Sequence, residues 1–595
     1  MSAKGPPEDD STLNEARGVP EEKDRTLPDF PAPQADEVTE AAPPIERRAT
    51  PRTAARAFDR SKGAAFLVGS GILLSRLAGL IRQTILARYL GAGFAADAFN
   101  AAFRIPNLLQ NLLGEGVLSA SFIPEYAGLL GRGDEKEATK LAGAVAGILA
   151  LVASILVLLG VLGAPWLVAV IANGFPLEKR DLTVKLTRIL FPGAGLFVFS
   201  AWCLGVLNSH RRFFMSYTAP VIWNAAMVAT LIFFHQGHTQ VELATYLAYG
   251  SVVGSALQFG IQLPQVFALA HGVRPRLTGA TESVRRVFRN FLPAFVGRGV
   301  VQISAYVDAW LASYLGNGAV SSFTYAQAIY VLPISLFGMA ISAAELPAMS
   351  RAVGTAAEIG AYLRGRLSDG LDRIAYFIVP SSVALFALGD LIVHLLFQSG
   401  RFQRDNTIWV WQILIGSTIG LLASTMGRLY SSTFYAMRDT RTPLRYAVVR
   451  VILTTVLGYL FALVLPGMLG LDRKLGAAGL TASAGLAGWV EFYLLRRELD
   501  RRIGRTRLVP ARMARLWGAA ILGAMIPWAY KLWVDRGAPV LSVHEAAIHS
   551  KLTALILLAA YGLMYLAITA ALGIPEARNV MDRGKRLFRL VVRTG

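Results

Sequence analysis

Residues 75–126 read SRLAGLIRQTILARYLGAGFAADAFNAAFRIPNLLQNLLGEGVLSASFIPEY, and this stretch decides the fold. It contains two apolar segments long enough to cross a bilayer, with charged side chains inside them. A charge at the bilayer centre costs about 2.5–3.5 kcal/mol on insertion scales, so such residues face a polar cavity or a partner of opposite charge. The charges here are mostly positive, which predicts a path through the membrane for an anion.

The composition predicts an all-α polytopic membrane protein. The chain has 595 residues, of which 54% are hydrophobic and only 16% charged, whereas soluble domains carry about 25% charged residues. Its one cysteine, Cys203, excludes an internal disulfide. The sequence contains no P-loop, no HExxH motif and no convincing nucleophile–base set, so we expect no enzyme activity, no metal site and no cofactor.

Apolar runs predict about 14 membrane spans. They are 64–90, 97–130, 141–172, 185–208, 215–235, 243–270, 285–315, 319–349, 372–398, 406–437, 443–466, 475–496, 512–534 and 550–573. If the N-terminus is cytoplasmic, the inner segments hold far more Lys and Arg than the outer ones, which places both termini in the cytoplasm. The net charge of +20 therefore reflects topology and attraction to anionic lipid headgroups rather than nucleic-acid binding.

The spans predict four parts of the chain. Residues 1–62 form an acidic, Pro-rich tail, expected to be disordered, that ends in a basic flank. Spans 1–6 form an N-lobe over 63–271, spans 7–12 a C-lobe over 272–500, and residues 501–595 hold a final helix pair and a basic tail.

A short internal repeat supports the two lobes. The sequence LARYLGAG at 86–93 matches LASYLGNG at 311–318 in six of eight positions, at an offset of 225 residues. The span after each copy contains a proline, Pro106 in the first and Pro333 in the second. Transporters are often built from such halves, with the cargo site between them at the bilayer midplane.

The first span places two arginines at membrane depth. Arg76 lies about 16 Å and Arg82 about 25 Å along a helix that starts near residue 65, and their side chains point about 120° apart, as in a wide cavity. Arg88 should reach the outer interface, where snorkelling to headgroups accounts for it.

The second span runs inward. Asp97 at its outer mouth is either a helix N-cap or a gate partner for an arginine. Arg104 and Glu115 are 11 residues apart, so in a continuous helix they share one face, about 16 Å apart. We expect Pro106 between them to kink or unwind the helix.

In the seventh span, Arg298 and Gln302 share a face near the midplane. Arg298 either adds to a cationic cavity or pairs with a carboxylate of the other half. A guanidinium stays charged and offers a two-pronged donor to phosphate, so clustered arginines suit a phosphate or pyrophosphate. A metal or proton antiporter would more naturally centre on carboxylates.

The motifs SRLAGLIR, GAGFAADAFNAAFRIPNLL and EGVLSASFIPEY resemble the lipid II flippases of the MurJ (MviN) family, in the multidrug/oligosaccharidyl-lipid/polysaccharide exporter superfamily. FYAMRDTRTP at 434–443 and LGAAGLTASAGLAGWVEFYLLRR at 475–497 resemble later blocks of that family, and the likeness covers about residues 63–590. The resemblance implies two six-helix lobes around a central cavity, and two further helices beside a groove for a polyprenyl tail.

By this resemblance, the chain moves lipid II, a lipid-linked peptidoglycan precursor, from the inner to the outer leaflet of the bacterial inner membrane by alternating access. Arg76, Arg82, Arg104 and Arg298 are then expected to bind cargo, and Asp97 and Glu115 to gate it. Lipid II, the membrane and its anionic headgroups are the expected partners, with cell-wall synthesis proteins as a further class. The chain departs from the family pattern at Gln110, Asn111 and Ala328, where arginines are usual.

Three other functions fit the same pattern. The cargo could be another polyprenyl-pyrophosphate oligosaccharide, or the chain could be a cation-coupled drug exporter of the same superfamily. It could also be a membrane scaffold for cell-wall enzymes with basic docking loops, although a scaffold would not need Arg76 and Arg82 inside a span.

Overall fold

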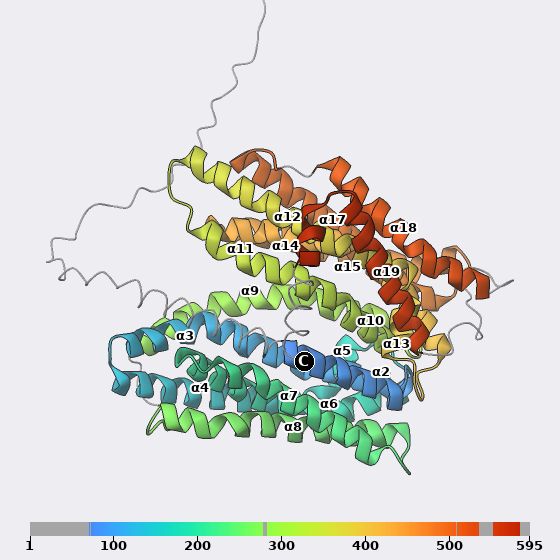
Figure 1. The fold of residues 1–595 in the computed structure, drawn as a ribbon. Helices are drawn as coiled ribbons and strands as arrows, with labels where there is room; N and C mark the ends of the chain where they lie inside the picture. The colour runs from blue at the N-terminus through green and yellow to red at the C-terminus, as the bar shows by residue number, and fades with distance from the viewer. Residues whose placement is uncertain (1–70, 72, 278–281, 507–508, 535–550, 583–595) are drawn as a thin grey trace, which may run out of the picture. The chain divides into compact units, whose positions relative to one another are not determined.

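A computed structural model describes residues 71, 73–277, 282–506, 509–534 and 551–582, without the side chains of 293–294, 296–298, 300–301 and 303–304. The predicted tail over 1–62 lies outside this range. Residues 73–90 are helical. The helices that follow are α2 (Phe94–Leu113), α3 (Glu115–Gly131), α4 (Glu135–Leu162), α5 (Ala164–Ile171), α6 (Leu177–Ser209), α7 (Phe213–Phe234), α8 (Gln240–Leu269), α9 (Glu282–Ser313), α10 (Ala319–Pro333), α11 (Ala340–Ser350), α12 (Ala356–Ala387), α13 (Gly389–Leu396), α14 (Arg404–Ala436), α15 (Arg441–Tyr459), α16 (Leu465–Met468), α17 (Gly476–Ile503), α18 (Pro510–Val534) and α19 (Lys551–Ala571). Figure 1 gives their arrangement.

The described part of the chain is helical, as the composition predicts. Within it, nine helices are long and apolar enough to cross a membrane, and each coincides with an expected span. The other five expected spans are mainly helical over their described residues, but charges or breaks interrupt their apolar character. The all-helical fold is therefore confirmed, and the count of 14 crossings stays a prediction.

The internal repeat is a structural repeat. Helices α2 and α10 start at Phe94 and Ala319, at the same offset as the two sequence copies. Helices α3 and α11 start at Glu115 and Ala340, again at that offset. Each half thus has a helix, a break and a second helix in the same register.

The break in the first half was predicted at the wrong residue. Helix α2 continues through Pro106, and the chain bends at Gly114 instead. A Cβ at Gly114 would lie 2.1 Å from the carbonyl oxygen of Gln110, so only glycine fits. In the second half a π-helix over Ile334–Met339, directly after Pro333, occupies the corresponding place.

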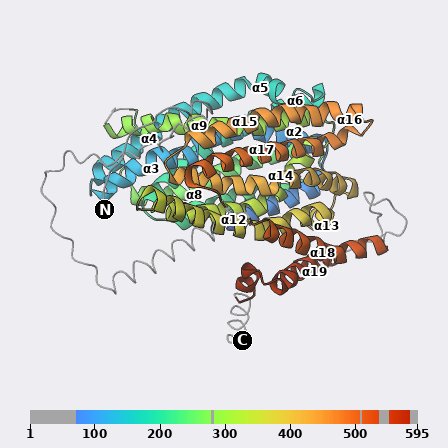
Figure 2. The same cartoon turned by 90° about the horizontal axis from the view of Figure 1, so that it is seen from above.

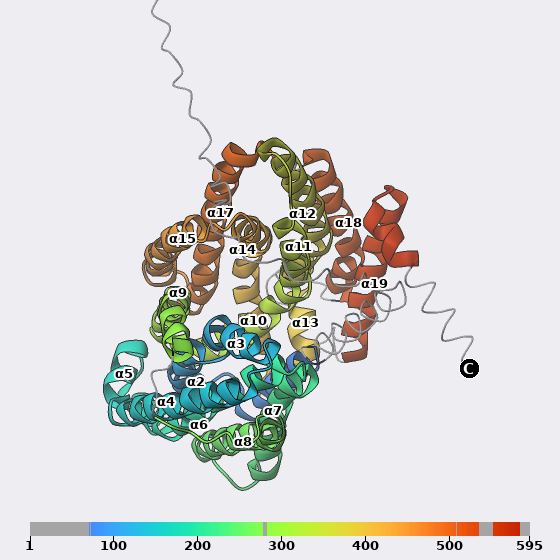
Figure 3. The same cartoon turned by 90° about the vertical axis from the view of Figure 1, so that its left-hand side faces the viewer.

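Helices of each half pack mainly on one another. α6 contacts α2, α3, α4 and α8, whereas α14 contacts α10, α11, α12 and α17. The last two helices, α18 and α19, pack on α12 and α13, as Figures 2 and 3 illustrate from two sides. Tyr561 and Tyr565 of α19 donate hydrogen bonds to the Pro380 and Tyr376 carbonyls of α12, both at 2.7 Å. The predicted division into lobes remains a proposal about domain boundaries.

Helices α14 and α17 of the second half approach each other closely at a pair of glycines. Gly420 of α14 lies against Gly485 of α17, where a Cβ would come within 2.3 Å of the Gly485 Cα. Gly420→Ala should therefore destabilise the protein by about 1–3 kcal/mol through overpacking. A lower melting temperature in detergent would report this. Gly427→Ala is the matched control, because a Cβ at Gly427 on the same helix meets no atom within 4 Å, and an equal loss there would contradict the packing argument.

Candidate functional site

A buried carboxylate joins the two halves at one end of the molecule. Asp97 of α2 is fully buried and accepts hydrogen bonds at the start of α10, from Gly318 N at 2.7 Å and from Ser321 N and Oγ, both at 2.8 Å. Helix α10 has no side-chain cap of its own. Asp97 of α2 thus caps α10. Its carboxylate accepts hydrogen bonds from the free amides at the start of α10 and places a negative charge at the positive end of the α10 dipole.

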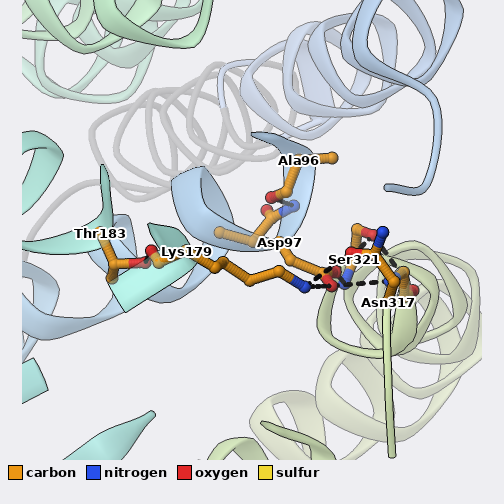
Figure 4. A network of polar contacts seen from close by, with 8 residues as sticks. Ala96, Asp97, Lys179, Thr183, Asn317 and Ser321 are labelled. Carbon is orange, nitrogen blue, oxygen red and sulfur yellow. Dashed lines mark hydrogen bonds and ion pairs between the residues drawn. The ribbon is translucent and has the colours of Figure 1, made fainter. Parts of the chain in front are cut away.

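A lysine from a third helix balances this charge. Lys179, in the first turn of α6, is 2% exposed, and its Nζ lies 3.0 Å from Asp97 Oδ2 and 2.7 Å from Asn317 Oδ1. The ammonium also lies over the ring of Phe175, 4.7 Å from its centroid. Figure 4 shows Lys179 and Asp97 converging on Asn317 and Ser321. We call Asp97, Lys179, Asn317 and Ser321 the closure cluster.

The two alternatives for Asp97 are both corrected by this geometry. Asp97 does not cap its own helix, whose N-cap is Gly93, and its cationic partner is a lysine rather than an arginine. Lys179 was missed because it lies in the charged run LEKRD, which reads as a solvated helix start. Neither its burial nor its partner 82 residues away leaves a local sequence signal.

Backbone contacts beside the closure cluster bring the halves together a second time. Arg401 N, in the turn between α13 and α14, donates a 2.9 Å hydrogen bond to Arg88 O at the end of the first helix. Gly91 (φ 64°) and Gly400 (φ 58°) permit this approach, since a Cβ on either would lie within 3 Å of a carbonyl oxygen of the other half. This end of the molecule is therefore closed by backbone as well as by side chains.

Arg82 is half-buried next to the closure cluster. Its Nε donates a 2.9 Å hydrogen bond to Asn224 Oδ1 of α7, and its guanidinium lies 4.8 Å from the centroid of the Trp223 ring. The hydroxyl of Tyr325 of α10 donates a 2.9 Å hydrogen bond to Gly91 O, near the end of the same helix as Arg82. Asn224 and Trp223 thus orient the guanidinium of Arg82, and no carboxylate among the described residues forms an ion pair with it.

Arg104 bridges the halves. Its Nη1 donates a 3.1 Å hydrogen bond to Ala305 O of α9, and its guanidinium lies 5.9 Å from the ring centroid of Phe323 of α10. Tyr306 of α9 donates in turn to Arg104 O at 2.9 Å. Arg104 also interacts electrostatically with Asp308, so its positive charge is partly balanced.

The remaining predicted site residues stand apart. Arg76 is exposed on the first helix, and Arg298 lies in α9 with its side chain outside the described residues. Glu115 is exposed and is the first residue of α3, where a negative charge suits the helix dipole. The predicted shared face of Arg104 and Glu115 is wrong, because the bend at Gly114 separates them into two helices.

An apolar groove lies between α12, α14, α17 and α18. Its volume is about 660 Å³, and apolar side chains line most of it, among them Phe386, Leu422, Trp489, Trp517 and Met525. Beyond the groove, Lys531 of α18 and Asp390 of α13 form a buried ion pair at 2.9 Å. The pair fixes α18 beside the body of the second half.

Two related halves of long apolar helices, closed at one end around buried charges, define a multi-pass membrane protein of the transporter class. A solved structure titled "Lipid II flippase MurJ, inward closed conformation" has the same fold, with TM-score 0.70, 21% identity, and coverage of 87% of this chain and 100% of that one. An inward-facing MATE family multidrug resistance transporter of the MOP superfamily aligns with TM-score 0.59 and 18% identity, covering 73% of this chain and 98% of that one.

Sequence comparison gives the family. Residues 86–546 match the family described as Lipid II flippase MurJ. The Lipid II flippase MurJ of Burkholderia cenocepacia is 32% identical over 446 residues, which cover 74% of this chain and 84% of that protein. The probable lipid II flippase MurJ of Rhizobium meliloti is 32% identical over 514 residues, 85% of this chain and 93% of that protein. The chain belongs to the MurJ family.

Removing the negative charge of Asp97 from the closure cluster should lower the stability of the protein. Asp97→Asn leaves Lys179 buried without its carboxylate, which costs about 3–5 kcal/mol in comparable buried pairs. We expect a lower melting temperature, partly recovered in Asp97→Asn/Lys179→Met, where no lone charge remains. Glu137→Gln is the control, because it breaks the exposed Lys140–Glu137 pair and should change stability little. A double variant less stable than Asp97→Asn would refute the charge argument.

Proposed function

We propose that this protein moves lipid II from the inner to the outer leaflet of the bacterial inner membrane by alternating access. Both termini and the α3–α4 turn then face the cytoplasm, and the closure cluster faces the outside. The proposal assigns no chemical step to the chain, because cargo crosses unchanged. It is supported by family membership and by one structural observation, which is that Arg82 is half-buried and is held by Asn224 and Trp223.

The chemistry of the cargo fits this arrangement. Lipid II carries a pyrophosphate, and a guanidinium that stays charged at all physiological pH values can bind it through paired hydrogen bonds. We propose that Arg76, Arg82, Arg104 and Arg298 bind this group between the halves. Asp97 is proposed to gate the outer end through Lys179, and Glu115 to act at the bend of the second span.

The groove beside α18 accounts for the other half of the cargo. A polyprenyl tail is apolar along its whole length, so it gains nothing from entering a polar cavity and should stay in the membrane or in an apolar channel. We propose that the tail occupies the groove between α12, α14, α17 and α18 while the headgroup crosses. The basic segment at 496–515 is proposed to contact anionic headgroups on the cytoplasmic side.

Loss of Arg76 and Arg82, two of the three arginines of the first helix, tests the headgroup site. Arg76→Ala/Arg82→Ala should fail to rescue a strain depleted of its own lipid II flippase and should lower lipid II exposure on the outer leaflet by about tenfold or more, because charge-assisted bonds to the pyrophosphate disappear. Arg82→Lys should retain part of the activity, because lysine keeps the positive charge but lacks the planar pair of N–H donors of a guanidinium.

Arg88→Ala is the matched control for that experiment. Arg88 lies on the same helix, but its side chain is exposed and stacks on Tyr89, 5.8 Å from the ring centroid. Rescue should be normal with this variant. Normal lipid II exposure with Arg76→Ala/Arg82→Ala, at equal protein levels and with no second flippase present, would rule out the proposed function.

Filling the groove tests the tail path. Met525 lines the groove, so Met525→Trp should slow flipping of full-length lipid II several-fold. A lipid II analogue with a shortened tail should be affected less, which can be measured in proteoliposomes. Ile526→Trp is the control, because Ile526 is the next residue on α18, is 49% exposed and is absent from the groove lining. Equal slowing by both variants, or with both substrates, would argue against a tail in this groove.

A further inference from the structure

A second cavity lies in the first half, at the end of the molecule opposite the closure cluster. Its volume is about 490 Å³, and it is bounded by the end of α3, the start of α4, the turn after α6 and the segment after α8. Figure 1 places the ends of these helices on one side of the molecule. None of its lining residues belongs to the closure cluster, to the proposed cargo site or to the apolar groove.

The cavity wall is rich in positive charge. Lys136 and Lys140 come from α4, and Arg274 and Arg276 come from the segment after α8. Glu135 is the one carboxylate in the lining, and Glu137 nearby pairs with Lys140 at 2.7 Å. Asp134 also lies near Lys140, so the four cations outnumber the three carboxylates Asp134, Glu135 and Glu137 by one.

Backbone contacts hold these cations in place. Arg276 N donates a 3.1 Å hydrogen bond to Gly143 O of α4. A Cβ at Gly143 would lie 2.4 Å from Arg274 O, and a Cβ at Gly147 would lie 2.4 Å from Arg276 O. The two glycines thus let the segment lie directly on α4. Two arginines on a segment fixed in this way lose less entropy on binding a ligand than they would on a free loop.

The cavity also offers uncharged donors. His210 and His271 line it, and Tyr126 Oη lies 3.1 Å from His210 Nε2. Four chain segments thus bring hydrogen-bond donors to one cavity, namely guanidinium, ammonium, imidazole and hydroxyl groups. A phosphate group, whose oxygen atoms are all acceptors, matches this set of donors. A free metal cation would be repelled by the four cationic side chains.

We propose that this cavity is a binding site for a phosphate-bearing anion, separate from the cargo path. The anion is either the headgroup of an anionic phospholipid or a soluble phosphate compound, since both present the same oxygen atoms. The segment after α8 leads into α9, which contacts α3 through Arg286 and Glu125 at 3.7 Å. A bound anion would therefore join α3, α4 and the connection between the two halves.

Binding to the full-length protein tests the site. The soluble probe is ATP, titrated in detergent, and the lipid probe is cardiolipin, offered in phosphatidylcholine nanodiscs and detected as a bound adduct by native mass spectrometry. For whichever of the two probes binds, Arg274→Gln/Arg276→Gln should weaken binding by about tenfold or more. Gly147→Ala should weaken it as well, although it leaves every charge in place, because it displaces the backbone of Arg276.

Two controls separate this site from others. Arg351→Gln/Arg441→Gln removes the same charge from exposed positions in the second half and should leave binding unchanged. Arg82→Ala reports phosphate bound at the proposed cargo arginines and should also leave it unchanged. Binding of ATP alone would assign a soluble anion, and binding of cardiolipin alone would assign a lipid headgroup.

The proposal is overturned if neither probe binds, or if the Arg274/Arg276 variant binds as well as the control variant. It is also overturned if only Arg82→Ala abolishes binding, because the phosphate would then occupy the cargo site. None of these outcomes depends on whether the protein flips lipid II, since binding is measured without transport.

Discussion

The buried charge of Asp97 is the constraint on which the closed end of the molecule depends. An ionised carboxylate away from water must be paired and hydrogen-bonded, and no neighbour on its own helix meets that need. The amides at the start of α10 and the ammonium of Lys179 meet it together. The halves therefore cannot part at this end unless water replaces each of these partners, which makes the contact suited to two discrete states rather than to gradual loosening.

The internal repeat explains why such a contact can form. The two equivalent turns bring the starts of α2 and α10 side by side, so a residue one turn into α2 can reach the free amides of α10. The repeat also places a break at the same register in each half, but by different means. Gly114 allows a sharp bend in one, whereas a π-helix absorbs the irregularity in the other. The break thus lies at an equivalent position in both halves, although a glycine produces it in one and a π-helix in the other.

How much of the structure can be predicted from the sequence depends on how far apart along the chain the interacting residues lie. Apolar runs and turn motifs are local, so the helices and the repeat were predictable. Arg82 and Asp97 could be singled out for the same reason, because a charge in an apolar run stands out, and their depth in the membrane stays a prediction. The partners of Asp97 were not, since Lys179 and Ser321 lie far along the chain in unremarkable contexts. The shared face of Arg104 and Glu115 failed because helical spacing assumes an unbroken helix, and Gly114 breaks it.

The choice of partner for Asp97 bears on how the arginines can act. If Asp97 paired with Arg82, closing this end would also neutralise the cation that is proposed to bind an anionic cargo. Pairing with Lys179 makes the closure cluster nearly neutral by itself. Arg82 is then oriented by the amide of Asn224 and the ring of Trp223, which fix its position without cancelling its charge. If Arg82 binds an anionic cargo as proposed, separate partners allow this end to close while the positive charge of Arg82 persists.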